Sequence, residues 1–166
     1  MRYNKIAYIS STTIPSTTAQ SHQILEMCKA LNEYSKLTLI SPVNLNNKNC
    51  LKVFSWKKIK LKFNFLYFRY CELFLKSYIE LKNNSYDLIF TRNIIIVFLI
   101  FFFKRPVIYE MHQKPSLISL LMLFVLKNNK HFYVVVISRA LSIFLSNFIL
   151  LKKLKGSVMH DGVDIQ

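Results

Sequence analysis

Glycine is scarce in this sequence, in which 166 residues include only two glycines and four prolines. The predicted loop over residues 11–18, which leads from a first strand into a helix, contains no glycine. A dinucleotide fingerprint needs glycines at this place, for its tight turn and for the close approach of the pyrophosphate. The sequence therefore argues against a nicotinamide or flavin dinucleotide site.

Cysteine is also sparse, with Cys28, Cys50 and Cys71 far apart and no C-x-x-C pair. An odd count at this spacing fits neither a disulfide framework nor a zinc site. Because no set of His, Cys, Asp and Glu has metal-ligand spacing, we expect no bound metal. The N-terminal residues have no secretory signal pattern. A reducing cytoplasm is therefore the default location.

No apolar run reaches the ~20 residues that a helix needs to cross a bilayer. The two longest runs, residues 94–103 and 117–126, are each about half that length. We interpret both as buried core helices, with membrane contact as the alternative.

Acidic residues are few, because eight Asp and Glu stand against 23 Lys and Arg, for a formal net charge of +15. A surface of this kind attracts polyanions such as nucleic acid, anionic lipid headgroups or phosphorylated substrates. A lysine-rich surface that is merely solvated explains the charge equally well.

Short apolar segments alternate with helical patterns along the chain. The predicted strands are residues 5–10, 37–40, 52–55, 87–91, 106–109 and 132–137, with a last extended segment at 157–159. The predicted helices are residues 20–34, 63–82, 94–103, 115–126 and 138–145, the last capped by Ser138. A polar loop is expected at 44–49. This alternation predicts an α/β fold: a single Rossmann-like domain with a doubly wound, mostly parallel sheet and helices on both faces.

Ligands of such sheets gather at the carboxyl ends of the strands, which directs attention to residues 10–21, 110–116 and 137–139. The first of these loops is rich in hydroxyl groups, including Ser16, Thr17, Thr18 and Ser21. Together with the free N–H groups of a helix start, these suit an anion or a polyhydroxylated ligand. Simple capping of the helix is the alternative.

Glu110 and His112 are the sharper feature, because residues two apart at the end of a strand point the same way. A carboxylate and an imidazole in this position can converge on one ligand, and histidine is tunable near neutral pH. The two side chains hydrogen-bonding each other is the alternative interpretation. His22, at a helix start, fits a structural role as well as a functional one, and His131 is interpreted as a surface residue.

Five short motifs occur in order along the chain: K-I-A-Y-I-S with I-P-S-T-T-A-Q-S-H-Q-I-L-E-M-C-K-A-L, then Y-D-L-I-F-T-R-N, V-I-Y-E-M-H, V-V-V-I-S-R-A-L and H-D-G-V-D. Over nearly its whole length the sequence thereby resembles the N-terminal domain of family 4 glycosyltransferases of the GT-B fold. It is most similar to the branch with an Ala-x-Ser loop, here Ala19 and Ser21.

The resemblance implies retaining transfer of a sugar from a nucleotide sugar, without a metal or other cofactor. It implies that residues 1–158 hold a glycan or lipid-linked acceptor and that residues 159–166 begin the crossover to a C-terminal donor domain. By match, His112 lies near the transferred sugar, and the loop from Ser16 to Ser21 faces the donor phosphates and the acceptor. Ser138 and Arg139 border the cleft, and Gly162, Val163 and Asp164 form the entry to the second domain.

No second domain follows Gln166, so we expect this chain to be inactive alone, as a truncated reading frame, half of a split gene or a shortened chain. A separate donor domain is then a possible partner. Another hypothesis is a basic module for an anionic membrane surface or nucleic acid, supported by the aromatic and basic stretch 57–82. Nucleic acid is the partner we expect least, and peripheral contact with the inner face of the membrane is compatible with the enzyme. A degenerate remnant without function is the third hypothesis.

Overall fold

One parallel sheet organises the part of the chain that the computed structural model describes, residues 3–43, 53–63, 65–148, 151 and 154–159. Its strands are β1 (Lys5–Ile9), β2 (Lys36–Pro42), β3 (Ser55–Ile59), β4 (Leu88–Thr91), β5 (Val107–Met111), β6 (Phe132–Val136) and β7 (Gly156–Val158). The helices are α1 (Ala19–Tyr34), α2 (Leu66–Asn83), α3 (Ile94–Val97), α4 (Ile100–Phe103), α5 (Leu117–Leu126) and α6 (Arg139–Ser146).

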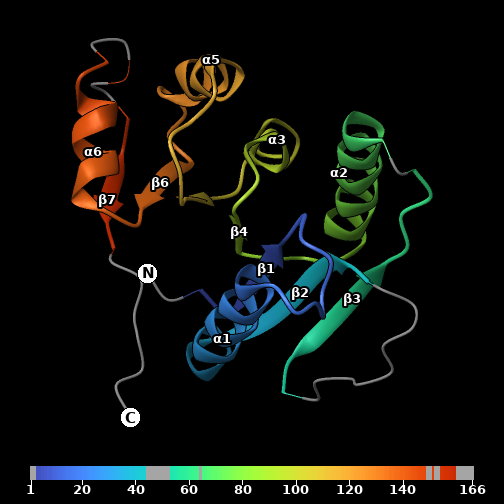
Figure 1. The fold of residues 1–166 in the computed structure, drawn as a ribbon. Helices are drawn as coiled ribbons and strands as arrows, with labels where there is room; N and C mark the ends of the chain where they lie inside the picture. The colour runs from blue at the N-terminus through green and yellow to red at the C-terminus, as the bar shows by residue number, and fades with distance from the viewer. Residues whose placement is uncertain (1–2, 44–52, 64, 149–150, 152–153, 160–166) are drawn as a thin grey trace.

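The strand order is β3-β2-β1-β4-β5-β6-β7, and every neighbouring pair is parallel. The chain builds outward from β1 to β3 and then crosses to β4, so the order switches between β1 and β4. Helix α1 lies on one side of the sheet, and α2, α3 and α5 lie on the other (Figure 1). The predicted doubly wound parallel α/β fold is confirmed.

Two clusters of buried side chains correspond to these two layers. Under α1, Ile24 and Cys28 pack with Ile6 and Tyr8 of β1. The second cluster joins β4, β5 and β6 to the buried residues of α2 through α6, among them Leu73 and Leu123. β4 is a central strand covered on both faces, so all four of its residues are buried and three of them are apolar.

The predicted third strand at residues 52–55 is wrong, because β3 comprises Ser55–Ile59 and shares only Ser55 with it. β3 is an edge strand paired with β2 alone, and Lys57 and Lys58 remain exposed on it. Lysines are common on edge strands, where they oppose further strand pairing. Lys57 and Lys58, which do not look like strand residues in the sequence, are therefore part of β3.

The run at residues 94–103 forms two short helices, α3 and α4, where one helix was predicted. Phe98 and Leu99 make a turn between them, with backbone bonds to the carbonyl oxygens three residues earlier, at Ile95 and Ile96. The β-branched residues that precede this turn lose side-chain freedom in an α-helix, which favours a short element.

Helix α5 corrects the prediction of buried core helices. Only Leu123 and Leu126 of α5 are fully buried, whereas five of its apolar side chains are exposed. Its exposed side chains are Leu117, Ile118, Leu121, Phe124 and Val125. On α4 likewise, Phe101 and Phe102 are exposed. Each helix touches the sheet along one side, and no described element covers the other side.

Side-chain caps begin several helices. The Ser138 hydroxyl accepts a hydrogen bond from the Leu141 N–H at 3.2 Å, which confirms the predicted cap of α6. Thr18 caps α1, and Asn93 caps α3. The predicted loop at 44–49 and the H-D-G-V-D motif at 160–164 lie outside the described residues. Among those described, no helix is both long and apolar enough to span a bilayer.

Candidate active site at the carboxyl ends of β4 and β5

A polar cavity of about 370 Å³ lies beside the carboxyl ends of β4 and β5 and the first turns of α1. It is lined by Gln20, Gln23, Arg92, Tyr109, Glu110, His112 and Gln113. In an open parallel sheet this is the edge at which ligands bind, next to the point where the strand order switches. The fold therefore brings together the first loop's helix and the Glu110–His112 pair.

Arg92 and Glu110 form the centre of this site. Arg92 follows β4 directly, and Glu110 is the fourth residue of β5. The guanidinium donates through Nε to Oε2 and through Nη2 to Oε1, both at 3.0 Å. The side chains are only 8% and 3% exposed. A bidentate pair of this kind fixes both orientation and charge, because the planar fork matches the carboxylate.

His112 completes the group, since its Nε2 lies 2.7 Å from Oε1 of Glu110. Of the two interpretations of the sequence, the structure has the one in which Glu110 and His112 hydrogen-bond each other. Both carboxylate oxygens of Glu110 thus contact Arg92 or His112. The His112 side chain is 24% exposed and lies at the cavity, so it is the member of the group that is accessible to a ligand.

Electrostatics keep Glu110 ionised. Burial by itself raises the pKa of the carboxyl group, but hydrogen bonds from His112 and Arg92, with the charge of Arg92, outweigh it. The net pKa is lowered from its usual value of 4.5. By contrast, burial raises the pKa of Tyr109 to about 12, so its phenol remains neutral at physiological pH. The cavity wall therefore offers one fixed carboxylate and a neutral hydroxyl.

A ring stack lies close to this site. Tyr8 of β1 stacks on Phe90 of β4, with centroids 5.2 Å apart and an angle of 15° between the rings. Tyr8 is completely buried. Burial raises the pKa of its phenol, the charge of Arg92 lowers it by less, and the pKa is therefore above its usual value of 10. This stack joins β1 to β4, the strand that Arg92 follows, through uncharged packing, which suits a preorganised site.

The predicted loop from Ser16 to Ser21 reaches the same edge of the sheet. Ser21 is fully buried, and its hydroxyl accepts the N–H of Ser16 at 3.1 Å. The Thr18 hydroxyl caps α1 and lies 2.9 Å from that of Ser16. Thr17, Thr18 and Ala19 are exposed. Capping and loop closure thus account for the hydrogen bonds of Ser16, Thr18 and Ser21 in this structure, and their contact with substrate stays a prediction.

Ser138 and Arg139 follow β6 at this edge, but neither lines the polar cavity. Ser138 caps α6, while the Arg139 side chain is exposed. Their proposed place at the border of a cleft stays a prediction.

Sequence reasoning missed Arg92, Gln20 and Gln23. The sequence alone led to no role for Arg92, although a residue directly after a buried parallel strand lies where ligands bind. That position was the available signal. Gln20 and Gln23 have no comparable signal, because polar residues are ordinary in the first turns of an exposed helix.

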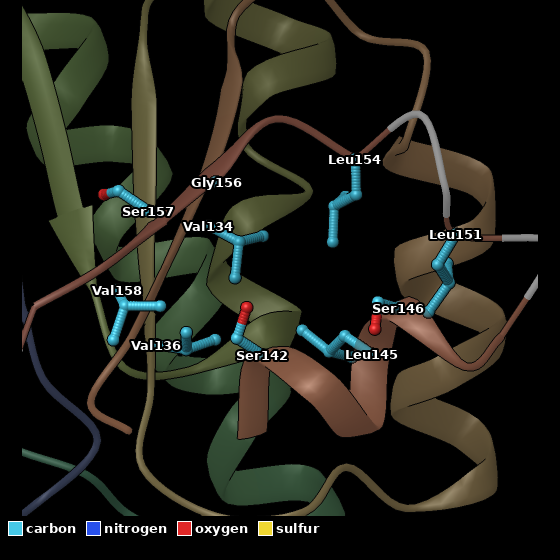
Figure 2. Close-up of a pocket in the computed structure, with 10 residues that line it drawn as sticks. All are labelled: Val134, Val136, Ser142, Leu145, Ser146, Leu151, Leu154, Gly156, Ser157 and Val158. Carbon is cyan, nitrogen blue, oxygen red and sulfur yellow. The ribbon is translucent and has the colours of Figure 1, made fainter. Parts of the chain in front are cut away.

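A second cavity, of about 330 Å³, lies between α6 and the β6–β7 edge (Figure 2). Val134, Val136, Leu145 and Leu154 point into it, and none of the described residues that line it is ionisable. Its polar lining consists of the serine side chains Ser142, Ser146 and Ser157, and it shares no lining residue with the first cavity. Among the described residues, no group of three or more His, Cys, Asp or Glu is arranged to hold a metal ion.

No protein-family model matches the chain, and no curated protein matches it by sequence. Solved structures match its fold. Sucrose-phosphate synthase from Thermosynechococcus elongatus has a TM-score of 0.69 at 13% identity, over 96% of this chain and 48% of its own. HepE of Anabaena, in complex with UDP and glucose, has a TM-score of 0.63 at 15% identity, over 98% and 45%. The lipopolysaccharide outer core galactosyltransferase WaaB gives 0.61 at 13% identity, over 98% and 47%.

These neighbours are GT-B glycosyltransferases. The chain has the fold of one half of such an enzyme, as its sequence resemblance implied. It spans about half the length of the solved chains. A shorter form of the synthase, with a TM-score of 0.66, is covered over 91% of its length.

Proposed function

We propose that this chain forms the acceptor-side part of a retaining glycosyltransferase that moves a sugar from a nucleotide sugar to a glycan or lipid-linked acceptor. The observation that carries the proposal is the Arg92–Glu110–His112 group, in a polar cavity at the carboxyl edge of a GT-B-type sheet. The fold alone would support many chemistries, so the proposal depends on this site.

In this proposal His112 contacts the sugar that is transferred, through a hydrogen bond to one of its hydroxyl groups. Glu110 holds the imidazole ring in place at 2.7 Å, and Arg92 keeps the carboxylate ionised and oriented. A ring held in this way binds without losing orientational freedom at the moment of reaction.

The start of α1 supplies the second element of the proposed site. Gln20 and Gln23 line the cavity from the first turns of this 16-residue helix. A helix N-terminus favours a negative charge, which suits the diphosphate of a nucleotide sugar. HepE is described in complex with UDP and glucose, the two parts of such a donor, and this supports the choice of donor class. The proposal requires neither a metal nor an organic cofactor.

We further propose that these 166 residues alone do not transfer sugar. The chain spans about half of the solved glycosyltransferases. In this proposal its residues form one wall of a cleft. A cleft needs both walls to orient the donor and to exclude water. Incubation of the purified chain with UDP-glucose and a membrane lipid extract should therefore give no labelled glycolipid. Measurable transfer would contradict this part of the proposal.

Binding tests the site itself. The ¹⁵N-labelled chain is titrated with UDP-glucose, UDP and glucose in separate NMR experiments. We expect UDP-glucose to shift the amide signals of residues 19–23 and 110–113. His112→Ala should reduce the affinity for UDP-glucose by about tenfold, the value of one lost charged or well-placed hydrogen bond.

The matched control is His131→Ala, which changes a histidine outside the cavity. It should bind UDP-glucose as the wild type does. Signals that move only at the β6–β7 edge, or binding that is equal in His112→Ala and the wild type, would contradict the proposed site.

A further inference from the structure

The outer side of the helical layer formed by α2, α4 and α5 is apolar. We define this outer face by the exposed side chains of those helices: Phe68, Leu75, Ile79, Phe101, Phe102, Leu117, Ile118, Leu121, Phe124 and Val125. Figure 1 shows α2, α3 and α5 on the same side of the sheet. Clustered exposed side chains of this size mark a surface that contacts something else, since scattered ones need no explanation.

Helical geometry sets the direction of this face. On α5 the buried residues Leu123 and Leu126 contact the core, and residues 117, 118, 121 and 125 repeat at the spacing of the opposite side. On α2, Leu73 and Leu81 are buried, while Phe68, Leu75 and Ile79 recur on the side away from the sheet. Both helices therefore direct apolar side chains outward.

Aromatic contacts make part of the face continuous. Phe102 of α4 meets Tyr78 of α2 edge-on, with ring centroids 5.3 Å apart, and Phe74 at 6.2 Å. Tyr78 also packs on Phe103 at 5.3 Å. These rings tie α4 to α2, so that the exposed residues of both belong to one surface.

The charges beside α4 and α5 select the partner of the face, whereas on α2 the acidic residues Glu72 and Glu80 pair with Lys76 and Lys57. From Leu88 to Met159 the sequence contains a single acidic residue, Glu110, which is buried against Arg92. The exposed charges along this part of the chain are consequently positive. Helix α5 has no charged residue, but Lys114 precedes it, and Lys127 follows it with Nζ 3.9 Å from the centroid of the Phe124 ring.

We infer that the outer face binds to the surface of an anionic lipid bilayer. Apolar side chains of α4 and α5 enter the boundary between headgroups and acyl chains, while Lys114 and Lys127 contact anionic headgroups. Exposed apolar residues together with flanking lysines are the combination that places helices at this interface. A second copy of the chain fits less well, because each copy has a net charge of +15 and two copies repel.

Sedimentation with liposomes tests this inference on the 166-residue chain. Vesicles of phosphatidylcholine with 30% phosphatidylglycerol are compared with vesicles of phosphatidylcholine alone. We expect binding to the anionic vesicles that weakens as salt rises. The affinity of the double variant Leu121→Ser/Val125→Ser for these vesicles should be lower by about tenfold or more, because the variant lacks two exposed apolar side chains. Both residues are exposed, so the fold should tolerate the change.

Two controls match these variants. Tyr34→Ser removes an exposed side chain of α1, on the other side of the sheet, and should bind vesicles as the wild type does. Lys127→Glu and Lys36→Glu change the net charge equally, but only the first lies at the outer face. Lys127→Glu should therefore weaken binding to anionic vesicles more than Lys36→Glu.

Several results would overturn the inference. One is a wild type that stays in the supernatant with anionic vesicles, and another is equal binding by Leu121→Ser/Val125→Ser and the wild type. A wild-type dimer in analytical ultracentrifugation that becomes monomeric in that variant would assign the face to self-association instead. Equal losses from the two lysine variants, with tighter binding to single-stranded RNA than to vesicles, would indicate general attraction to polyanions. The inference does not depend on sugar transfer.

Discussion

Arg92 and Glu110 join the ends of two neighbouring strands through two hydrogen bonds of 3.0 Å, with both side chains almost fully buried. They are 18 positions apart in the sequence, Arg92 directly after β4 and Glu110 on β5, and these two strands pair in parallel. The pair is therefore both a brace across the carboxyl edge of the sheet and the support of His112. Substitution of Arg92 or Glu110 is therefore expected to lower both the free energy of unfolding and the affinity for a ligand of His112.

Breaking the pair should be costly. Arg92→Ala leaves the buried Glu110 carboxylate without its main cation, and we expect the free energy of unfolding to fall by about 3 kcal/mol. Urea denaturation followed by the fluorescence of Trp56 measures this. Lys36→Ala, on an exposed lysine, should change it by less than about 0.5 kcal/mol. Arg92→Ala/Glu110→Ala should lose less than the sum of the two single variants, and strictly additive losses would show that the pair contributes no coupling.

Glu110 should also make stability depend on pH. Because its pKa in the folded chain is below the usual 4.5, its ionised form favours folding. That contribution is fully present above about pH 4.5 and is lost as the pH falls through the lowered pKa. The difference in unfolding free energy between the wild type and Glu110→Gln should therefore shrink from pH 7 to pH 3. Glu33→Gln, on the exposed side of α1, is the control, and an unchanged Glu110→Gln difference would contradict the prediction.

Gly156 should be intolerant of any side chain. A Cβ atom built there would lie 2.7 Å from the carbonyl oxygen of Val134 on β6, and a backbone atom cannot move aside easily. Gly156→Ala should therefore loosen β7 and expose the Met159 N–H, which donates to the Val136 oxygen at 2.9 Å. Hydrogen exchange at Met159 should accelerate in this variant. Ser157→Ala on the same strand should leave it unchanged, and equal rates in both variants would refute the clash.

Much of the fold could be predicted because its signals are local. The apolar run of β1, the helical spacing of Ile24 and Cys28, and the Ser138 cap each operate within a few residues. The third strand was misplaced because Lys57 and Lys58 lie on an edge, where lysines are compatible with a strand. Nothing in the local sequence says which strand will be an edge, since that depends on its neighbours.

The site was partly predictable for the same reason. Glu110 and His112 are two residues apart, so their common direction follows from strand geometry. Arg92 lies 18 positions from Glu110, and only the pairing of β4 with β5 brings the guanidinium to the carboxylate. The exposure of α5 was not predictable either. Nine of its ten residues are apolar, so its sequence does not indicate whether other elements cover one side of the helix or every side.

By itself, the sequence determined the alternation of strands and helices, the absence of a glycine-rich dinucleotide loop and the placing of Glu110 and His112 at the end of one strand. Short-range sterics and hydrogen bonding decide these features within a few residues. The tertiary structure alone decided that Arg92 braces Glu110, that β3 is an edge and that α5 presents its apolar side outward. Each of those features depends on whether segments far apart in the sequence lie in contact, and only the folded sheet decides that.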